Sequence, residues 1–115
     1  MRQYFMHSKK ILRVYQTKNQ KEPFTKWLLS LRDVTARAKI RARLDNLMLG
    51  HYGDCKNISD GVKELRLHTC SGYRVYIGEI DDVIVLLLCG GNKSSQKKDI
   101  EKAKKYWHDF QERNL

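Results

Sequence analysis

The sequence predicts a small α+β fold in which a short antiparallel sheet is covered by helices on one face. Apolar and polar residues alternate over 62–68 and 73–77, as in half-buried strands. Residues 83–89 form the longest uninterrupted apolar run, which is typical of a central strand buried on both faces. Three further segments carry apolar residues at helical spacing, so the expected order is β-α-α-β-β-β-α. A chain of 115 residues is expected to form one domain over 1–115, with 1–10 weakly ordered.

The first half of the chain contains one expected strand and two helices. Residues 11–17 are β-branched and aromatic enough for a strand. Pro23 suits the first turn of a helix, which runs to about Leu31 because its apolar residues recur at helical spacing. Asp33 is a suitable N-cap for a second helix, and Gly50 is suited to end it. Arg37, Lys39, Arg41 and Arg43 would form a basic face of that helix, in contact with solvent or with a polyanion.

The second half contains a loop, three strands and a helix. Residues 51–61 are rich in turn-forming residues and are expected to be a loop. Strands follow at 62–68, 73–77 and 83–89, joined by turns at 71–72 and 81–82, which predicts an antiparallel meander. Ser94 or Ser95 would cap the last helix, whose buried stripe includes Ala103 and Trp107.

The composition narrows the possible functions. The chain has 23 Lys and Arg residues against 13 Asp and Glu residues, a net charge of +10, which favours nucleic acid or an acidic protein as partner. No apolar run is long enough for a membrane span, so a cytoplasmic protein without membrane contact is expected. Cys55, Cys70 and Cys89 stand at unrelated spacings, so neither disulfides nor a zinc site are expected. The sequence predicts no metal and no cofactor.

A set of polar residues on neighbouring strands is the clearest candidate for a chemical site. Glu64, Arg66 and His68 share one strand face, and Arg74 and Tyr76 share a face of the next strand. Arginine side chains suit phosphate, and His68, Glu64 or Tyr76 can move protons. The alternative is a cross-strand ion pair between Glu64 and an arginine on a solvated sheet.

The turn at 90–95 (Gly-Gly-Asn-Lys-Ser-Ser) joins a buried strand to a helix. It lacks the glycine spacing of a Walker loop, so ATP binding is not expected. Backbone amides and Lys93 at a helix N-terminus can hold one phosphate. The alternative is a strand-ending turn with Lys93 in water.

Several short blocks together resemble one known family. They are residues 23–28, the helix around 36–44, 52–56, Glu-Leu-Arg at 64–66, Gly-Tyr-Arg-Val-Tyr at 72–76 and Gly-Gly-Asn-Lys-Ser-Ser at 90–95. In this order and spacing, over about residues 10–110, they resemble the RelE/ParE toxin superfamily, and its HigB-like addiction module killer branch in particular.

The resemblance implies a RelE-like fold and the toxin of a bacterial type II toxin–antitoxin pair. The implied activity is metal-independent cleavage of mRNA, often on the ribosome. The implied partner is a helix-turn-helix antitoxin, and operator DNA would be bound only through the toxin–antitoxin complex. The expected catalytic residues are Arg66, His68, Arg74 and Tyr76, and the expected RNA-phosphate contacts are Lys63, Lys93 and Lys97.

One family position differs in this sequence. RelE carries a tyrosine in its last helix approximately where Ile100 stands here, so Tyr76, Tyr106 or His68 would have to transfer the proton. Two alternative functions follow. One is a ParE-like toxin that binds DNA gyrase, and the other is a degenerate module that binds its partner without catalysis.

Overall fold

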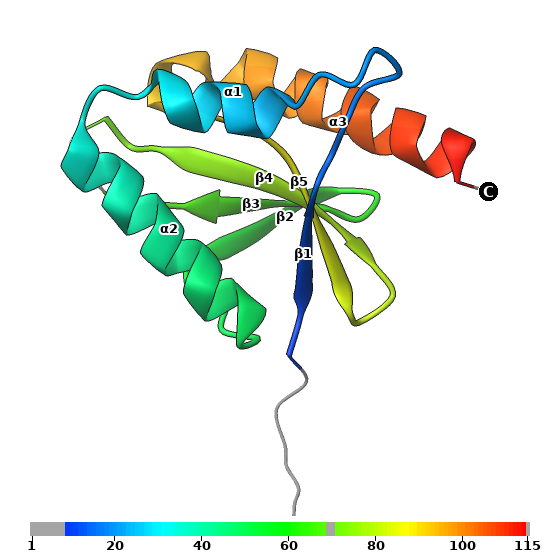
Figure 1. The fold of residues 1–115 in the computed structure, drawn as a ribbon, viewed down its shortest axis with the longest axis horizontal. Coiled ribbons are helices and arrows are strands. Elements are labelled where there is room, and N and C mark those ends of the chain that lie inside the picture. The colour runs from blue at the N-terminus through cyan, green and yellow to red at the C-terminus, as the bar shows by residue number, and fades with distance from the viewer. Residues whose placement is uncertain (1–8, 69–70, 115) are drawn as a thin grey trace, which may run out of the picture.

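The computed structural model describes residues 9–68 and 71–114, and the chain can be followed in Figure 1. The strands are β1 (Ile11–Val14), β2 (Cys55–Ser59), β3 (Val62–Arg66), β4 (Arg74–Ile80) and β5 (Ile84–Gly91). The helices are α1 (Pro23–Ser30), α2 (Val34–Met48) and α3 (Gln96–Arg113), with a short 3-10 turn, η1 (Lys93–Ser95), directly before α3. The expected α+β class is confirmed. Residues 1–8, within the segment expected to be weakly ordered, and Cys70 lie outside the described residues.

The strands form one mixed sheet in the order β1-β5-β4-β3-β2. The expected antiparallel meander is confirmed for β3, β4 and β5. The expectation of a purely antiparallel sheet is wrong, because β1 pairs with β5 in parallel. Two helices separate β1 from the meander along the chain. A connection of this length allows β1 to pair with β5 in parallel, which a short hairpin turn would not.

The loop expected at 51–61 contains the strand β2, which pairs with β3 along the sheet edge. Its sequence, Cys-Lys-Asn-Ile-Ser, shows no alternation of apolar and polar residues. An edge strand with one solvated side is held by backbone hydrogen bonds and needs little apolar surface, so periodicity does not reveal it.

Helices cover both faces of the sheet, so the expectation that all helices pack on one face is wrong. Val85 and Leu87 of β5 belong to the apolar cluster that includes Phe24 of α1 and Ile40 of α2. The alternate residues Leu86 and Leu88 belong to a second cluster with Ala103 and Trp107 of α3. A strand that is apolar on both faces needs a helical layer on each side, because buried apolar surface stabilises the fold.

Side-chain caps stand at the start of α2 and of the η1 turn that leads into α3. The expected cap of α2 is confirmed, since Oδ1 of Asp33 accepts hydrogen bonds from the amides of Thr35 and Ala36. Before α3, the capping side chain is Asn92, which accepts from the amides of Ser94 and Ser95. No helix in the described residues combines the length and the apolar composition needed to span a bilayer.

Candidate functional site

Arg66 and Arg74 lie side by side at one end of the sheet. They are direct cross-strand partners in the β3–β4 pair, so both side chains project from the same face. This is the face that α3 covers. The Arg66 side chain is 33% exposed and the Arg74 side chain 13% exposed. Two guanidinium groups are therefore held close together at the border between the α3 layer and solvent.

The buried carboxylate of Glu64 lies beneath these two arginines. Its Oε1 accepts a hydrogen bond from Nε of Arg66 at 3.0 Å. Its Oε2 accepts from the Tyr76 hydroxyl at 3.0 Å and from Nε2 of Gln96 at 2.9 Å, and lies 3.6 Å from Nε of Arg74. Burial raises the pKa of the Glu64 carboxyl, but the hydrogen bonds from Gln96, Arg66 and Tyr76 outweigh it and leave the pKa below its ordinary value. Glu64 is therefore an ionised anchor for both arginines.

The structure places Tyr76 beneath the site and outside its lining. The side chain is fully buried, and its hydroxyl donates to Glu64. Burial, followed by the contact with the Glu64 carboxylate, raises the pKa of the phenol. A phenol with this geometry holds its proton and does not reach an exposed substrate, so the expected proton transfer by Tyr76 is not supported by its position.

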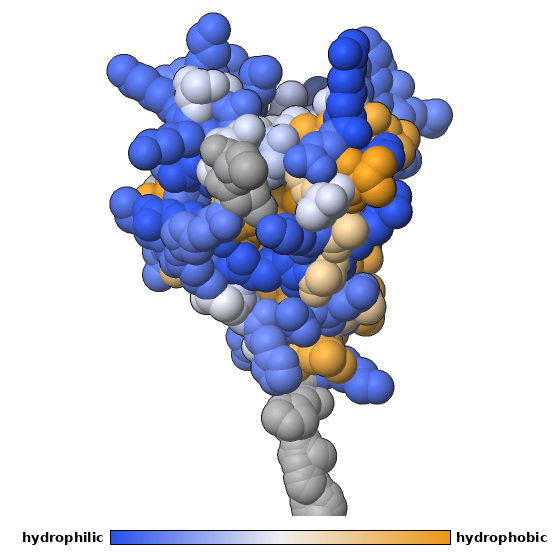
Figure 2. Space-filling model, turned by 90° about the vertical axis from the view of Figure 1, so that its left-hand side faces the viewer, coloured by the Kyte–Doolittle hydropathy of each residue, from blue (hydrophilic) through white to orange (hydrophobic). Residues whose placement is uncertain are grey.

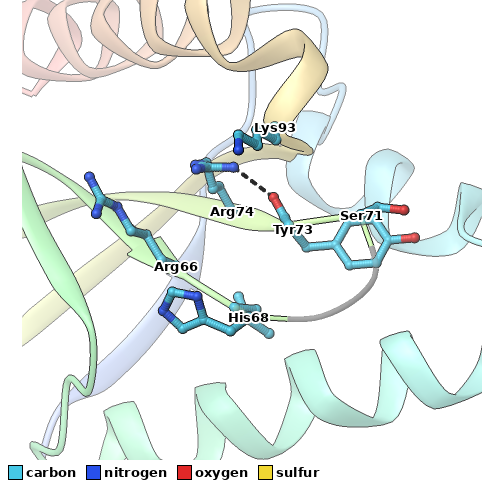
Figure 3. A pocket seen from close by; sticks show the side chains of 8 residues that line it. Arg66, His68, Ser71, Tyr73, Arg74 and Lys93 are labelled. Atoms are coloured by element: carbon cyan, nitrogen blue, oxygen red, sulfur yellow. Dashed lines mark hydrogen bonds between the residues drawn. The ribbon is translucent and has the colours of Figure 1, made fainter.

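Arg66, His68, Arg74 and Lys93 line one pocket of about 520 Å³. Figure 3 shows Lys93 on one side of Arg74 and His68 on the other. Leu67 also lines it, and Ser71, Gly72 and Tyr73 complete the lining from the segment before β4. The end of the molecule that carries this pocket is mainly hydrophilic (Figure 2). The structure thus brings together four of the seven residues that the sequence predicted for the site.

His68 is far more accessible than the two arginines and is paired with Asp54. Its side chain is 78% exposed, and Nε2 lies 2.6 Å from Oδ2 of Asp54. This hydrogen bond holds the pKa of the Asp54 carboxyl below its usual value. When Asp54 accepts a hydrogen bond from Nε2–H of a neutral imidazole, the other ring nitrogen of His68 is left as a proton acceptor. Asp54 is a residue that the sequence analysis missed, because it lies 14 positions away in a segment expected to be a featureless loop.

Arg43 fixes the backbone around this His68–Asp54 pair. Its guanidinium donates four hydrogen bonds, two to the carbonyl of Tyr52 and one each to the carbonyls of Asp54 and Arg66. Gly53 adopts φ +67°, and a Cβ there would lie 2.9 Å from the guanidinium. The expectation that Arg43 lies on a basic outer face of α2 is wrong. The side chain instead joins α2, the 52–54 loop and the end of β3.

The turn that carries Lys93 offers a side chain and few backbone donors. Asn92 uses the amides of Ser94 and Ser95 for its cap, and the amide of Lys93 donates to the carbonyl of Ser71 at 3.3 Å. The backbone amides that were expected to hold a phosphate at this helix start are therefore already bonded within the protein. The exposed Lys93 ammonium remains as the group that can meet a phosphate.

The other predicted residues lie elsewhere. Lys63 is on the opposite face of β3, where Nζ lies 2.7 Å from Oε1 of Glu79 and 5.1 Å from the centre of the Tyr52 ring. Lys97 is exposed on α3 and does not line the pocket. Tyr106 stacks on Tyr15 at 5.0 Å between ring centres and also lies outside the lining. The one-residue alternation of a strand separates Lys63 from Glu64 and Arg66.

Comparison with known proteins identifies a relative in Haemophilus influenzae. That protein, described as an uncharacterized protein, is 49% identical over 81 residues, which cover 70% of this chain and 82% of the relative. No protein-family model matches the chain.

Proposed function

We propose that this chain, which belongs to the same family as the Haemophilus influenzae protein, is a toxin that cleaves mRNA without a metal ion. The observation that carries the proposal is the pocket that combines three cationic side chains with a histidine bonded to a carboxylate. Arginine and lysine neutralise phosphate charge, and a histidine oriented by a carboxylate is a general base. RNA supplies its own nucleophile, the 2′-hydroxyl, so these groups suffice for strand cleavage.

The proposed reaction gives each of these groups a role. The scissile phosphate binds between Arg66 and Arg74, which neutralise the charge that develops on its oxygens. His68 accepts the proton of the 2′-hydroxyl, and Asp54 stabilises the resulting imidazolium. The 2′-oxygen forms a bond to phosphorus while the bond from phosphorus to the 5′-oxygen breaks, which yields a 2′,3′-cyclic phosphate and a 5′-hydroxyl.

Lys93 completes the reaction at the leaving oxygen. In-line displacement places the attacking and leaving oxygens on opposite sides of phosphorus, and Figure 3 shows His68 and Lys93 on opposite sides of Arg74. Lys93 stabilises and protonates the 5′-oxygen, and Glu64 keeps both arginines in position from below.

The cellular setting of the proposal comes from the motif resemblance. The chain is the toxin of a type II toxin–antitoxin pair in the cytoplasm, acts on mRNA on the ribosome, and is neutralised by a helix-turn-helix antitoxin. Operator DNA is bound only through the complex of toxin and antitoxin. The net charge of +10 suits a polyanionic target.

The test is induced expression followed by primer extension on a reporter mRNA, with analysis of the RNA ends. Wild type should arrest growth and produce 2′,3′-cyclic phosphate ends. His68→Ala should lower cleavage by about 10²–10⁴-fold. Because the His68 side chain is 78% exposed, its truncation leaves the core intact. His108→Ala is the matched control, since that histidine is also exposed, is 74% accessible and lies on α3 beside Glu112.

Each result separates the candidate functions. Cleavage that is lost in His68→Ala and kept in His108→Ala supports the ribonuclease. Growth arrest without RNA cleavage contradicts it and directs the search to DNA gyrase, where a supercoiling assay decides. No growth arrest with wild type also contradicts it and leaves a module that only binds its partner.

A further inference from the structure

A second hollow, larger than the candidate site, is lined by residues of both α1 and α3. It has a volume of about 940 Å³ and is defined here as the α1–α3 groove. Its floor is the end of β5 at Gly90 and Gly91. It borders the candidate site at two places, because Tyr73 lines both hollows and Asn92 of the groove directly precedes Lys93. The two hollows are therefore neighbours on the surface of the molecule.

Aromatic side chains from both helices line the groove. Trp27 of α1 packs directly over Gly90, where a Cβ would overlap its indole ring, and meets Tyr73 edge-on at 6.0 Å between ring centres. Tyr106 lines the groove from α3. All three residues are partly exposed. Accessible aromatic faces in a groove are the usual platforms for unpaired bases.

The charges along the groove are also suited to a nucleic acid strand. Lys21, Lys26 and Lys102 line it, and all three are exposed. The lining contains two carboxylates, and the structure pairs both. Glu22 accepts hydrogen bonds from Gln16 and Thr25, and Asp99 accepts one from Ser95 at 2.5 Å. Three exposed lysines thus line the groove, and both of its carboxylates already accept hydrogen bonds from the protein.

We propose that the α1–α3 groove binds single-stranded RNA that continues from the phosphate in the candidate site. The assignment rests on the proposed ribonuclease function. An unpaired strand fits because its bases can stack on exposed rings while lysines meet its backbone. A protein segment is the competing occupant, but the shared border with the candidate site and the lysines on both helices favour the nucleic acid.

The experiment uses a 2′-O-methyl octanucleotide, which lacks the attacking hydroxyl and so binds without being cut. The test variant is Lys26→Ala with Lys102→Ala, which removes one exposed lysine from each wall. The control is Lys56→Ala with Lys104→Ala, which removes two exposed lysines outside the groove lining. Both variants lower the net charge equally, so a difference between them reports position and not overall charge.

Affinity and its salt dependence are measured by fluorescence anisotropy. The groove variant should bind the octanucleotide about tenfold more weakly and show a shallower salt dependence, while the control variant stays close to wild type. Tryptophan emission provides a second readout. Trp27 should be quenched by the octanucleotide, whereas Trp107 is buried and bonded to the carbonyl of Asp60. Trp27→Phe should abolish the quenching.

The possible failures are distinguishable. If wild type cleaves RNA and binds the octanucleotide, but the groove variant matches the control, the groove assignment is wrong and the ribonuclease proposal stands. Unchanged tryptophan emission on saturation would also overturn the groove assignment. If wild type neither binds the octanucleotide nor cleaves RNA, the proposed function itself fails and the groove assignment falls with it.

Discussion

Replacing Glu64 with glutamine tests the idea that one buried carboxylate holds the site together. The substitution keeps the shape of the side chain and removes its charge. One of the two oxygens becomes an amide nitrogen, which cannot accept a hydrogen bond. If the nitrogen takes the Oε1 position it faces Nε of Arg66, and if it takes the Oε2 position it faces Tyr76 and Gln96. Either orientation sets donor against donor in a fully buried position.

The size of the effect follows from the hydrogen bonds that the substitution weakens or removes. A hydrogen bond to a charged group contributes about 1.5–3 kcal/mol, and breaking a buried ion pair costs about 3–5 kcal/mol. Glu64 has three such hydrogen bonds, and a second arginine lies 3.6 Å away. Some hydrogen bonds survive in the isosteric amide, so Glu64→Gln should lower the free energy of unfolding by about 2–4 kcal/mol. Loss of RNA cleavage should accompany it, because both arginines lose their anchor.

The dependence on pH gives an independent check. The folded-state pKa of Glu64 lies below its ordinary value of 4.5, so the carboxylate stabilises the fold above that value. This contribution is lost as the pH falls through the lowered pKa. The stability difference between wild type and Glu64→Gln should therefore be full near neutrality and shrink below about pH 4.5.

The assay is urea unfolding followed by tryptophan fluorescence at several pH values. Glu101→Gln is the matched control, because Glu101 is exposed on α3 and should change stability by less than about 0.5 kcal/mol. The reasoning is refuted if Glu64→Gln unfolds within that same margin of wild type, or if the difference does not depend on pH between 3 and 7.

Three further changes test the architecture, two by urea unfolding and one by RNA cleavage. Asp33→Ala should cost about 1 kcal/mol, because it removes the acceptor for two amides at the start of α2; no loss would mean that the cap does not contribute. Gly78→Ala should cost about 1–3 kcal/mol, because its Cβ would overlap the Trp107 ring; wild-type stability would show that the ring is free to move. Arg43→Lys should weaken RNA cleavage more than Lys39→Arg, since one ammonium cannot serve three carbonyls; equal cleavage rates would contradict the positioning role.

The candidate site was partly predictable because strand geometry is periodic. The alternation over 62–68 and 73–77 places Arg66 and Arg74 on one face, and the short turn between them makes them neighbours. His68 was predicted from the same alternation, and Lys93 from the turn at 90–95 and from the family resemblance. The burial of Tyr76 against Glu64 was not predicted. Alternation indicates the face on which a side chain lies, but it does not indicate which element covers that face.

Local sequence thus determined which segments form β3, β4, β5 and the three helices, since hydrophobic period, capping and turn residues act over a few positions. Tertiary structure decided the rest. It placed α3 over Glu64 and Tyr76, paired Asp54 with His68 across 14 residues, and seated Arg43 on three carbonyls from separate segments. These contacts depend on which surfaces pack together. Burial and hydrogen bonding across the whole chain decide that packing, and no short window of sequence contains it.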